Sequence, residues 1–84
     1  MTVFIQGRFP LQQWVAICDW LIENFDSLFC ELRWADFPCR RESVDIDRLV
    51  SWRSTHVSVL ELDRVLLSVS GPDDLVTWFK LRHL

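Results

Sequence analysis

The chain has 84 residues, of which half are hydrophobic and a quarter charged, and its 12 acidic and 9 basic side chains give a formal net charge of −3. This length and composition predict one globular domain over residues 1–84, without a linker or a second domain. The interspersed charges argue against the basic stripe of a nucleic-acid binder, and no apolar run is long enough to span a bilayer.

The three cysteines, Cys18, Cys30 and Cys39, do not form a disulfide framework. Reduced thiols and the lack of a secretion signal predict a cytoplasmic protein without a membrane partner. Neither C-x-x-C nor H-x-x-x-H is present to bring Cys30 and Cys39 together with His56 and His83. We therefore expect no metal and no cofactor.

Residues 2–6 are rich in β-formers and predict a first strand, in which Val3 and Ile5 share one side. Gly7 ends it, and Pro10 suits the start of a helix that runs to residues 24–27. The core stripe of this helix repeats at three- and four-residue spacing and comprises Leu11, Trp14, Val15, Cys18, Leu21, Ile22 and Phe25.

Two apolar residues of this helix fall outside its core stripe. Trp20 lies on the far side and Ile17 on the flank, one turn before it. One interpretation is that the second helix or a loop covers Trp20. The other is that Ile17 and Trp20 bind a partner, because indole rings are enriched at interface hot spots.

Residues 28–34 alternate with a period of two and predict a strand, which places Phe29, Glu31 and Arg33 opposite Cys30 and Leu32. Residues 36–42 contain Pro38 and are predicted to be a connection. Residues 43–54 fit both the two-residue alternation of a strand and the spacing of a helix, so we expect a strand-like start followed by an irregular or short helical segment.

The runs 56–62 and 64–70 are rich in β-formers and predict an antiparallel hairpin about Asp63 and Arg64. A second helix follows, with Ser70 as its cap and Pro72 in its first turn. Its buried face comprises Leu75, Val76 and Phe79, and Trp78 lies on the flank. Residues 80–84 either expose Leu81 or form a last short strand.

The order of these elements predicts an α+β fold. We expect a two-layer sandwich, an antiparallel sheet of about four strands with two helices on one face, close to the ferredoxin-like β-α-β-β-α-β plan.

The run Asp73-Asp74-Leu75-Val76-Thr77-Trp78-Phe79-Lys80-Leu81-Arg82 resembles the ending of small phage-encoded α+β accessory proteins. The resemblance covers these ten residues and stops at His83-Leu84, where the family pattern continues with an aromatic residue and a glycine. It implies an accessory protein that binds and modulates a host or defence protein in the host cytoplasm, as the ferredoxin-like anti-CRISPR inhibitors do.

No constellation of residues indicates catalysis, and we expect a protein that is not an enzyme. Five tryptophans and six phenylalanines are many for a domain that buries about 60–65% of its unfolded surface. We therefore predict that Ile17, Trp20, Trp52 and Trp78 bind a host or defence protein, or a second copy in a homodimer. A third hypothesis, in which Phe29, Trp34 and Arg33 bind single-stranded nucleic acid, is opposed by the net acidity.

Overall fold

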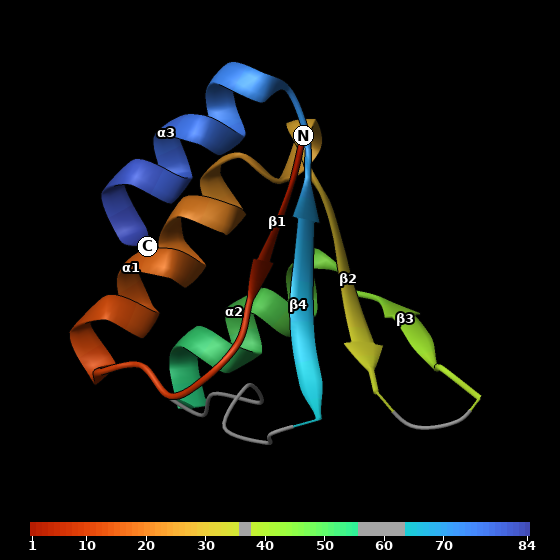
Figure 1. Cartoon of the computed structure of the whole chain (residues 1–84). Coiled ribbons are helices and arrows are strands. Elements are labelled where there is room, and N and C mark those ends of the chain that lie inside the picture. The colour runs from red at the N-terminus through yellow and green to blue at the C-terminus, as the bar shows by residue number, and fades with distance from the viewer. Residues whose placement is uncertain (36–37, 56–63) are drawn as a thin grey trace.

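A computed structural model of the chain describes residues 1–35, 38–55 and 64–84 (Figure 1). These residues form one four-stranded antiparallel sheet in the order β1-β4-β2-β3, with helices on one side of it. The elements along the chain are β1 (Thr2–Ile5), α1 (Leu11–Glu23), the 3-10 turn η1 (Phe25–Ser27), β2 (Phe29–Trp34), β3 (Arg41–Ser43), α2 (Ile46–Thr55), β4 (Val65–Ser70) and α3 (Asp73–His83). The predicted α+β class and the antiparallel sheet are confirmed.

The sheet is organised around β4, which pairs antiparallel with β1 on one side and with β2 on the other. Because β1 and β2 are thus parallel, α1 links them as a split βαβ unit around β4. The α2 connection likewise links β3 to β4 around β2. Residues 56–62 of the predicted hairpin lie outside the described residues.

The described part of the chain has three α-helices, whereas two were predicted. The additional one is α2, which covers most of the segment that fitted both periods. The Asp45 carboxylate accepts a hydrogen bond of 2.9 Å from the backbone N–H of Arg48 and so caps this helix. Leu49 and Trp52 are buried. The segment is a helix rather than a strand because, as a helix, it has an apolar face that packs against the rest of the protein.

Alternation along the strands was predicted correctly. Val3 and Ile5 of β1 are buried, and so are Cys30 and Leu32 of β2. The stripe of α1 is buried at its centre, but Leu11 in its first turn is 54% exposed. A residue at the end of a helix has neighbours on one side only, so periodicity overstates its burial.

The start of α3 differs from the prediction. Ser70 does not cap it, because Ser70 ends β4 and its hydroxyl lies 2.8 Å from the hydroxyl of Thr2. Pro72 holds the N-cap position without a side-chain hydrogen bond. The two carboxylates of the first turn, Asp73 and Asp74, still lie at the positive end of the helix dipole.

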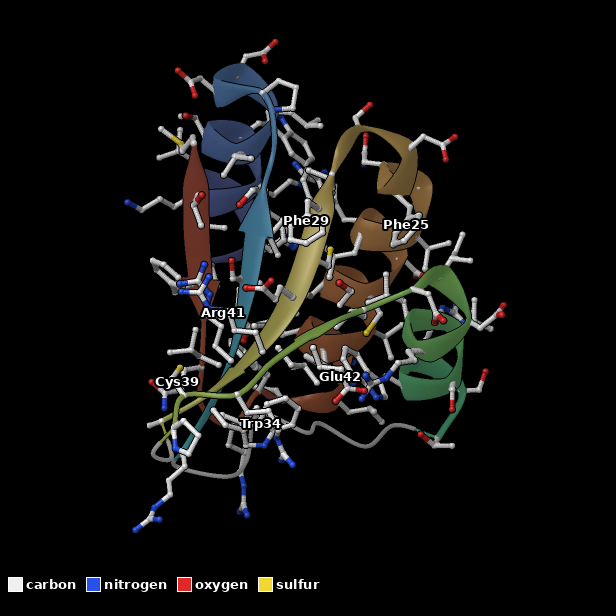
Figure 2. The ribbon with its side chains drawn as sticks, turned by 90° about the vertical axis from the view of Figure 1, so that its right-hand side faces the viewer. Phe25, Phe29, Trp34, Cys39, Arg41 and Glu42 are labelled. Carbon is white, nitrogen blue, oxygen red and sulfur yellow. The ribbon has the colours of Figure 1, made fainter. Side chains whose placement is uncertain are left out.

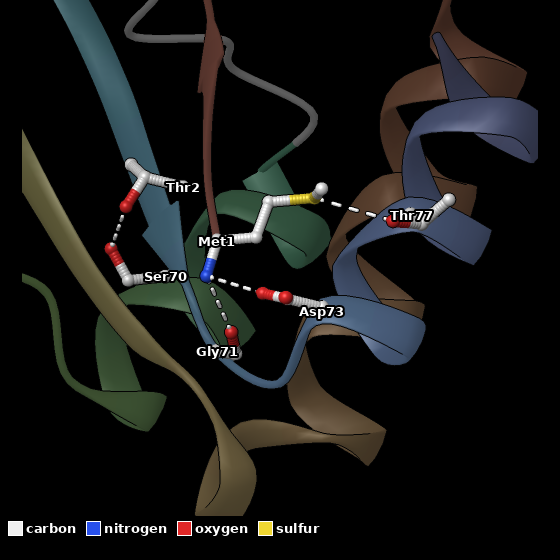
Figure 3. Close-up of polar contacts among 6 residues, drawn as sticks. All are labelled: Met1, Thr2, Ser70, Gly71, Asp73 and Thr77. Carbon is white, nitrogen blue, oxygen red and sulfur yellow. Dashed lines mark hydrogen bonds and ion pairs between the residues drawn. The ribbon is translucent and has the colours of Figure 1, made fainter.

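Polar contacts connect β1 to the start of α3 (Figure 3). The amino group of Met1 donates to the carbonyl of Gly71 at 3.1 Å and lies 3.0 Å from a carboxylate oxygen of Asp73. The Thr77 hydroxyl donates to the sulfur of Met1 at 3.3 Å. A Cβ at Gly71 would lie 2.7 Å from a methyl carbon of Leu28, so only glycine fits this close approach without displacement.

Candidate functional site

Two of the four predicted partner-binding residues, Ile17 and Trp20, are buried, which corrects the prediction that they face solvent. Ile17 is 0% and Trp20 7% exposed. The ring of Trp20 lies 4.5 Å from the ring of Phe79 and 6.3 Å from that of Trp78, both of α3. Helix α1 runs between α2 and α3 (Figure 1), so its far side is covered by helix packing, the first of the two interpretations.

Trp52, the third predicted residue, is also buried, at 7% exposure. Its ring lies 6.2 Å from that of Trp14, which in turn stacks with Phe9 at 6.3 Å. The guanidinium of Arg48 lies 5.4 Å from the Trp52 ring. Trp52 therefore joins α2 to α1 and is a core residue.

Trp78 alone of the four is exposed, at 48%, and it belongs to an apolar outward surface of α3. Leu81 on the same helix is 83% exposed, and Leu84 at its C-cap is 51% exposed. The Arg82 guanidinium lies 5.3 Å from the Trp78 ring. We call Trp78, Leu81 and Leu84 the α3 surface.

A second surface is the side of the sheet opposite the helices. Phe4 of β1 and Phe29 of β2 are 54% and 53% exposed there. Phe4 pairs with Ser68 of β4, and Phe29 pairs with Ser70. Paired residues point to the same side of a sheet, so the two rings lie on either side of Ser68, which is 2% exposed, and the half-buried Ser70. We call this side the open sheet face.

Charged residues cross the open sheet face on β2 and β3. Arg33 lies directly opposite Arg41 in the strand register. Nε of Arg33 donates to Glu31 at 3.0 Å, and its guanidinium lies 5.5 Å from the Phe4 ring. The Arg41 side chain has no ion-pair partner within residues 1–35, 38–55 and 64–84. It projects away from α2, whereas Glu42 points toward that helix (Figure 2) and pairs with Arg48 at 2.6 Å.

Trp34 does not share the open sheet face with Phe29. Its register partner is Val65, which is buried beneath the helices, and the Arg40 guanidinium lies 4.2 Å from its ring. The hypothesis that Phe29, Trp34 and Arg33 form one binding surface is therefore wrong for Trp34, which lies on the other side of the sheet. The ring that does share this face with Phe29 is Phe4, which alternation places on the outward side of the first strand.

Two of the thiols in the described residues are poor nucleophiles. Burial raises the pKa of the Cys18 thiol to about 12 and that of Cys30 to about 11, so both resist ionisation to the nucleophilic thiolate. Desolvation, followed by the charge of Arg82, lowers the pKa of His83. Among the described residues no group of three metal-ligating side chains is close enough to hold an ion.

In the part of the chain that the structure describes, none of the helices has the length and apolar character needed to cross a membrane. No family model matches the chain, and neither a curated protein nor a solved structure does.

Proposed function

We propose that this protein is a small, non-catalytic binding domain that docks a partner protein on the α3 surface. Exposure of Trp78, Leu81 and Leu84 on a single helix supports it. Trp14, Trp20 and Trp52 are buried, so among these four indoles only Trp78 is free to contact another molecule. Exposed apolar side chains grouped in this way are typical of protein interaction sites.

The surroundings of Trp78 favour binding. Its ring stacks on Trp20 at 6.3 Å, with planes inclined by 17°, and Arg82 lies against it. An indole restrained before binding loses little conformational entropy when a partner contacts it. Tryptophan and arginine are also among the residues most enriched at interface hot spots.

The charge beside the α3 surface indicates the chemistry of the partner. Lys80 and Arg82 lie in the last turns of α3, next to Leu81. A partner segment that carries apolar side chains with acidic neighbours would complement both features.

The resemblance of residues 73–82 to phage accessory proteins concerns this same helix. It favours a host or defence protein in the cytoplasm as the partner, and inhibition of that protein as the outcome.

The experiment compares Leu81→Arg with Val50→Arg as matched control. Leu81 is 83% and Val50 46% exposed, so neither change is expected to unfold the domain. A tagged protein would be used to capture partners from the cells in which it acts. We expect capture by the wild type and Val50→Arg, and loss of the same partner with Leu81→Arg.

Light scattering tests the homodimer alternative with the same variants. A wild-type dimer that Leu81→Arg converts to a monomer would identify a second copy as the occupant and overturn the foreign partner. Equal capture by all three proteins would show that the α3 surface is not the binding site.

A further inference from the structure

We infer that the open sheet face binds single-stranded RNA, with bases stacked on Phe4 and Phe29 and phosphate held by Arg41 and Arg33. This surface lies on the opposite side of the sheet from the helices. The inference is therefore independent of protein docking on α3.

The two phenylalanine rings have the spacing of a stacking surface. They lie two strands apart across β4 and, by the register of their partners Ser68 and Ser70, two residues apart along the strands. Strand spacing and rise place their Cα atoms about 12 Å apart. Stacked nucleotides rise about 3.4 Å each, so a short single strand with splayed bases reaches both rings. Exposed aromatic side chains on a four-stranded sheet suit unpaired bases, whose faces a duplex hides.

The arginines provide charge complementarity to phosphate. Arg33 and Arg41 oppose each other on neighbouring strands, an arrangement that repulsion destabilises unless an anion lies between the charges. Glu31 accepts a hydrogen bond only from Nε of Arg33. The guanidinium lies over the Phe4 ring at 5.5 Å, so a base stacked on Phe4 would displace it and leave its two terminal nitrogens to donate to phosphate.

Charge is also divided between the two sides of the protein. Arg33 and Arg41 outnumber Glu31 on the open sheet face, whereas on the helices and their N-terminal flanks six acidic residues outnumber the four basic residues Arg48, Arg53, Lys80 and Arg82. These acidic residues are Asp19, Glu23, Asp45, Asp47, Asp73 and Asp74. The formal net charge of −3 therefore does not describe the face that would meet RNA.

A pair of hydroxyl groups favours RNA over DNA. Thr2 and Ser70 share a row of the sheet with Phe29, and their oxygen atoms lie 2.8 Å apart. One of the two hydroxyls donates to the other, so the pair keeps one free O–H donor and its remaining lone pairs for a ribose 2′-hydroxyl of a nucleotide stacked on Phe29. DNA lacks that group.

The test is fluorescence anisotropy with a labelled oligouridylate of about eight nucleotides at about 50 mM salt, with the matching deoxy oligomer alongside. Phe4→Ala and Phe29→Ala should each weaken RNA binding on the order of tenfold. Arg41→Gln should reduce the slope of log affinity against log salt by about 0.7, the value for one phosphate contact on a single strand. Trp78→Ala is the matched control, because it removes an exposed aromatic ring elsewhere and should leave RNA affinity unchanged.

Retention of the wild-type melting temperature confirms that each variant is folded. The inference is overturned if the wild type does not bind oligouridylate at roughly 100 µM protein, or if folded Phe4→Ala/Phe29→Ala binds as tightly as the wild type. Equal affinity for the RNA and DNA oligomers would overturn the assignment to RNA. Loss of partner capture with Leu81→Arg while RNA binding persists would separate the two surfaces.

Discussion

Trp14 and Trp20 lie on the same helix, and different neighbouring helices bury them. Trp14 packs against Trp52 of α2 at 6.2 Å, and Trp20 packs against Phe79 of α3 at 4.5 Å. The indole N–H of Trp14 is buried and has no hydrogen-bond acceptor within the described residues. Apolar packing therefore holds this ring in place, and both tryptophans are structural.

Replacement of Trp20 by alanine should lower the free energy of unfolding by about 3–5 kcal/mol, because it leaves a cavity between α1 and α3. Leu81→Ala is the control, since an 83% exposed side chain should change stability by no more than about 0.5 kcal/mol. Urea denaturation followed by tryptophan fluorescence measures both. A loss below about 1 kcal/mol for Trp20→Ala would mean that α3 does not cover this ring.

At the scale of elements, α1 is the centre of the helix layer, and its neighbours hold it by different means. An ion pair joins Asp19 of α1 to Arg53 of α2. On the other side, the Gln13 amide donates to the backbone carbonyl of His83 at 2.9 Å. The imidazole of His83 lies 5.2 Å from the Phe79 ring, so the last turn of α3 contains a titratable group against an aromatic surface.

Protonation of His83 should destabilise the folded protein. Burial and the charge of Arg82 lower its pKa below the ordinary value of 6.5. The unfolded state then binds more protons at mildly acidic pH. The stabilisation is complete above pH 6.5 and is lost as the pH falls through the pKa of the folded state.

This effect is measured by comparing melting temperatures of the wild type and His83→Gln between about pH 7.5 and 5. The wild type should lose more stability than the variant as the pH falls. Parallel curves for the two proteins would contradict this assignment.

At the scale of the whole molecule, the helices and the sheet enclose two of the three thiols. Cys18 of α1 and Cys30 of β2 are 0% and 2% exposed, whereas Cys39 is exposed and donates to the carbonyl of Trp34. The two buried sulfur atoms lie in the same apolar core between the layers.

A thiol reagent such as a disulfide dye should therefore label the native protein rapidly at Cys39 alone. Cys18 and Cys30, whose pKa values burial raises to about 12 and about 11, should react only when the protein unfolds. Cys39→Ser should abolish the rapid phase and leave the slow one. Rapid labelling of Cys39→Ser would show that the core opens readily.

Local sequence determined the strands and much of the helix pattern. The alternation of Val3 and Ile5, and of Cys30 and Leu32, predicted which side of each strand is buried. It also placed Phe4 and Phe29 outward, since neighbouring side chains in a strand point to opposite faces. The spacing of Trp14, Cys18 and Leu21 likewise predicted the core of α1.

Only the tertiary structure decided which outward residues stay exposed. Trp20 lies off the main stripe of α1, and whether it is covered depends on α3, a helix some fifty residues away whose position no local period encodes. The burial of Trp52 could not be predicted either, because α2 lies in a segment whose sequence fitted both a strand and a helix. Leu81 projects away from the side of α3 that packs against α1 and β1 and stays 83% exposed, whereas Trp78 lies at the edge of that packing, with its ring stacked on Trp20 and still 48% exposed.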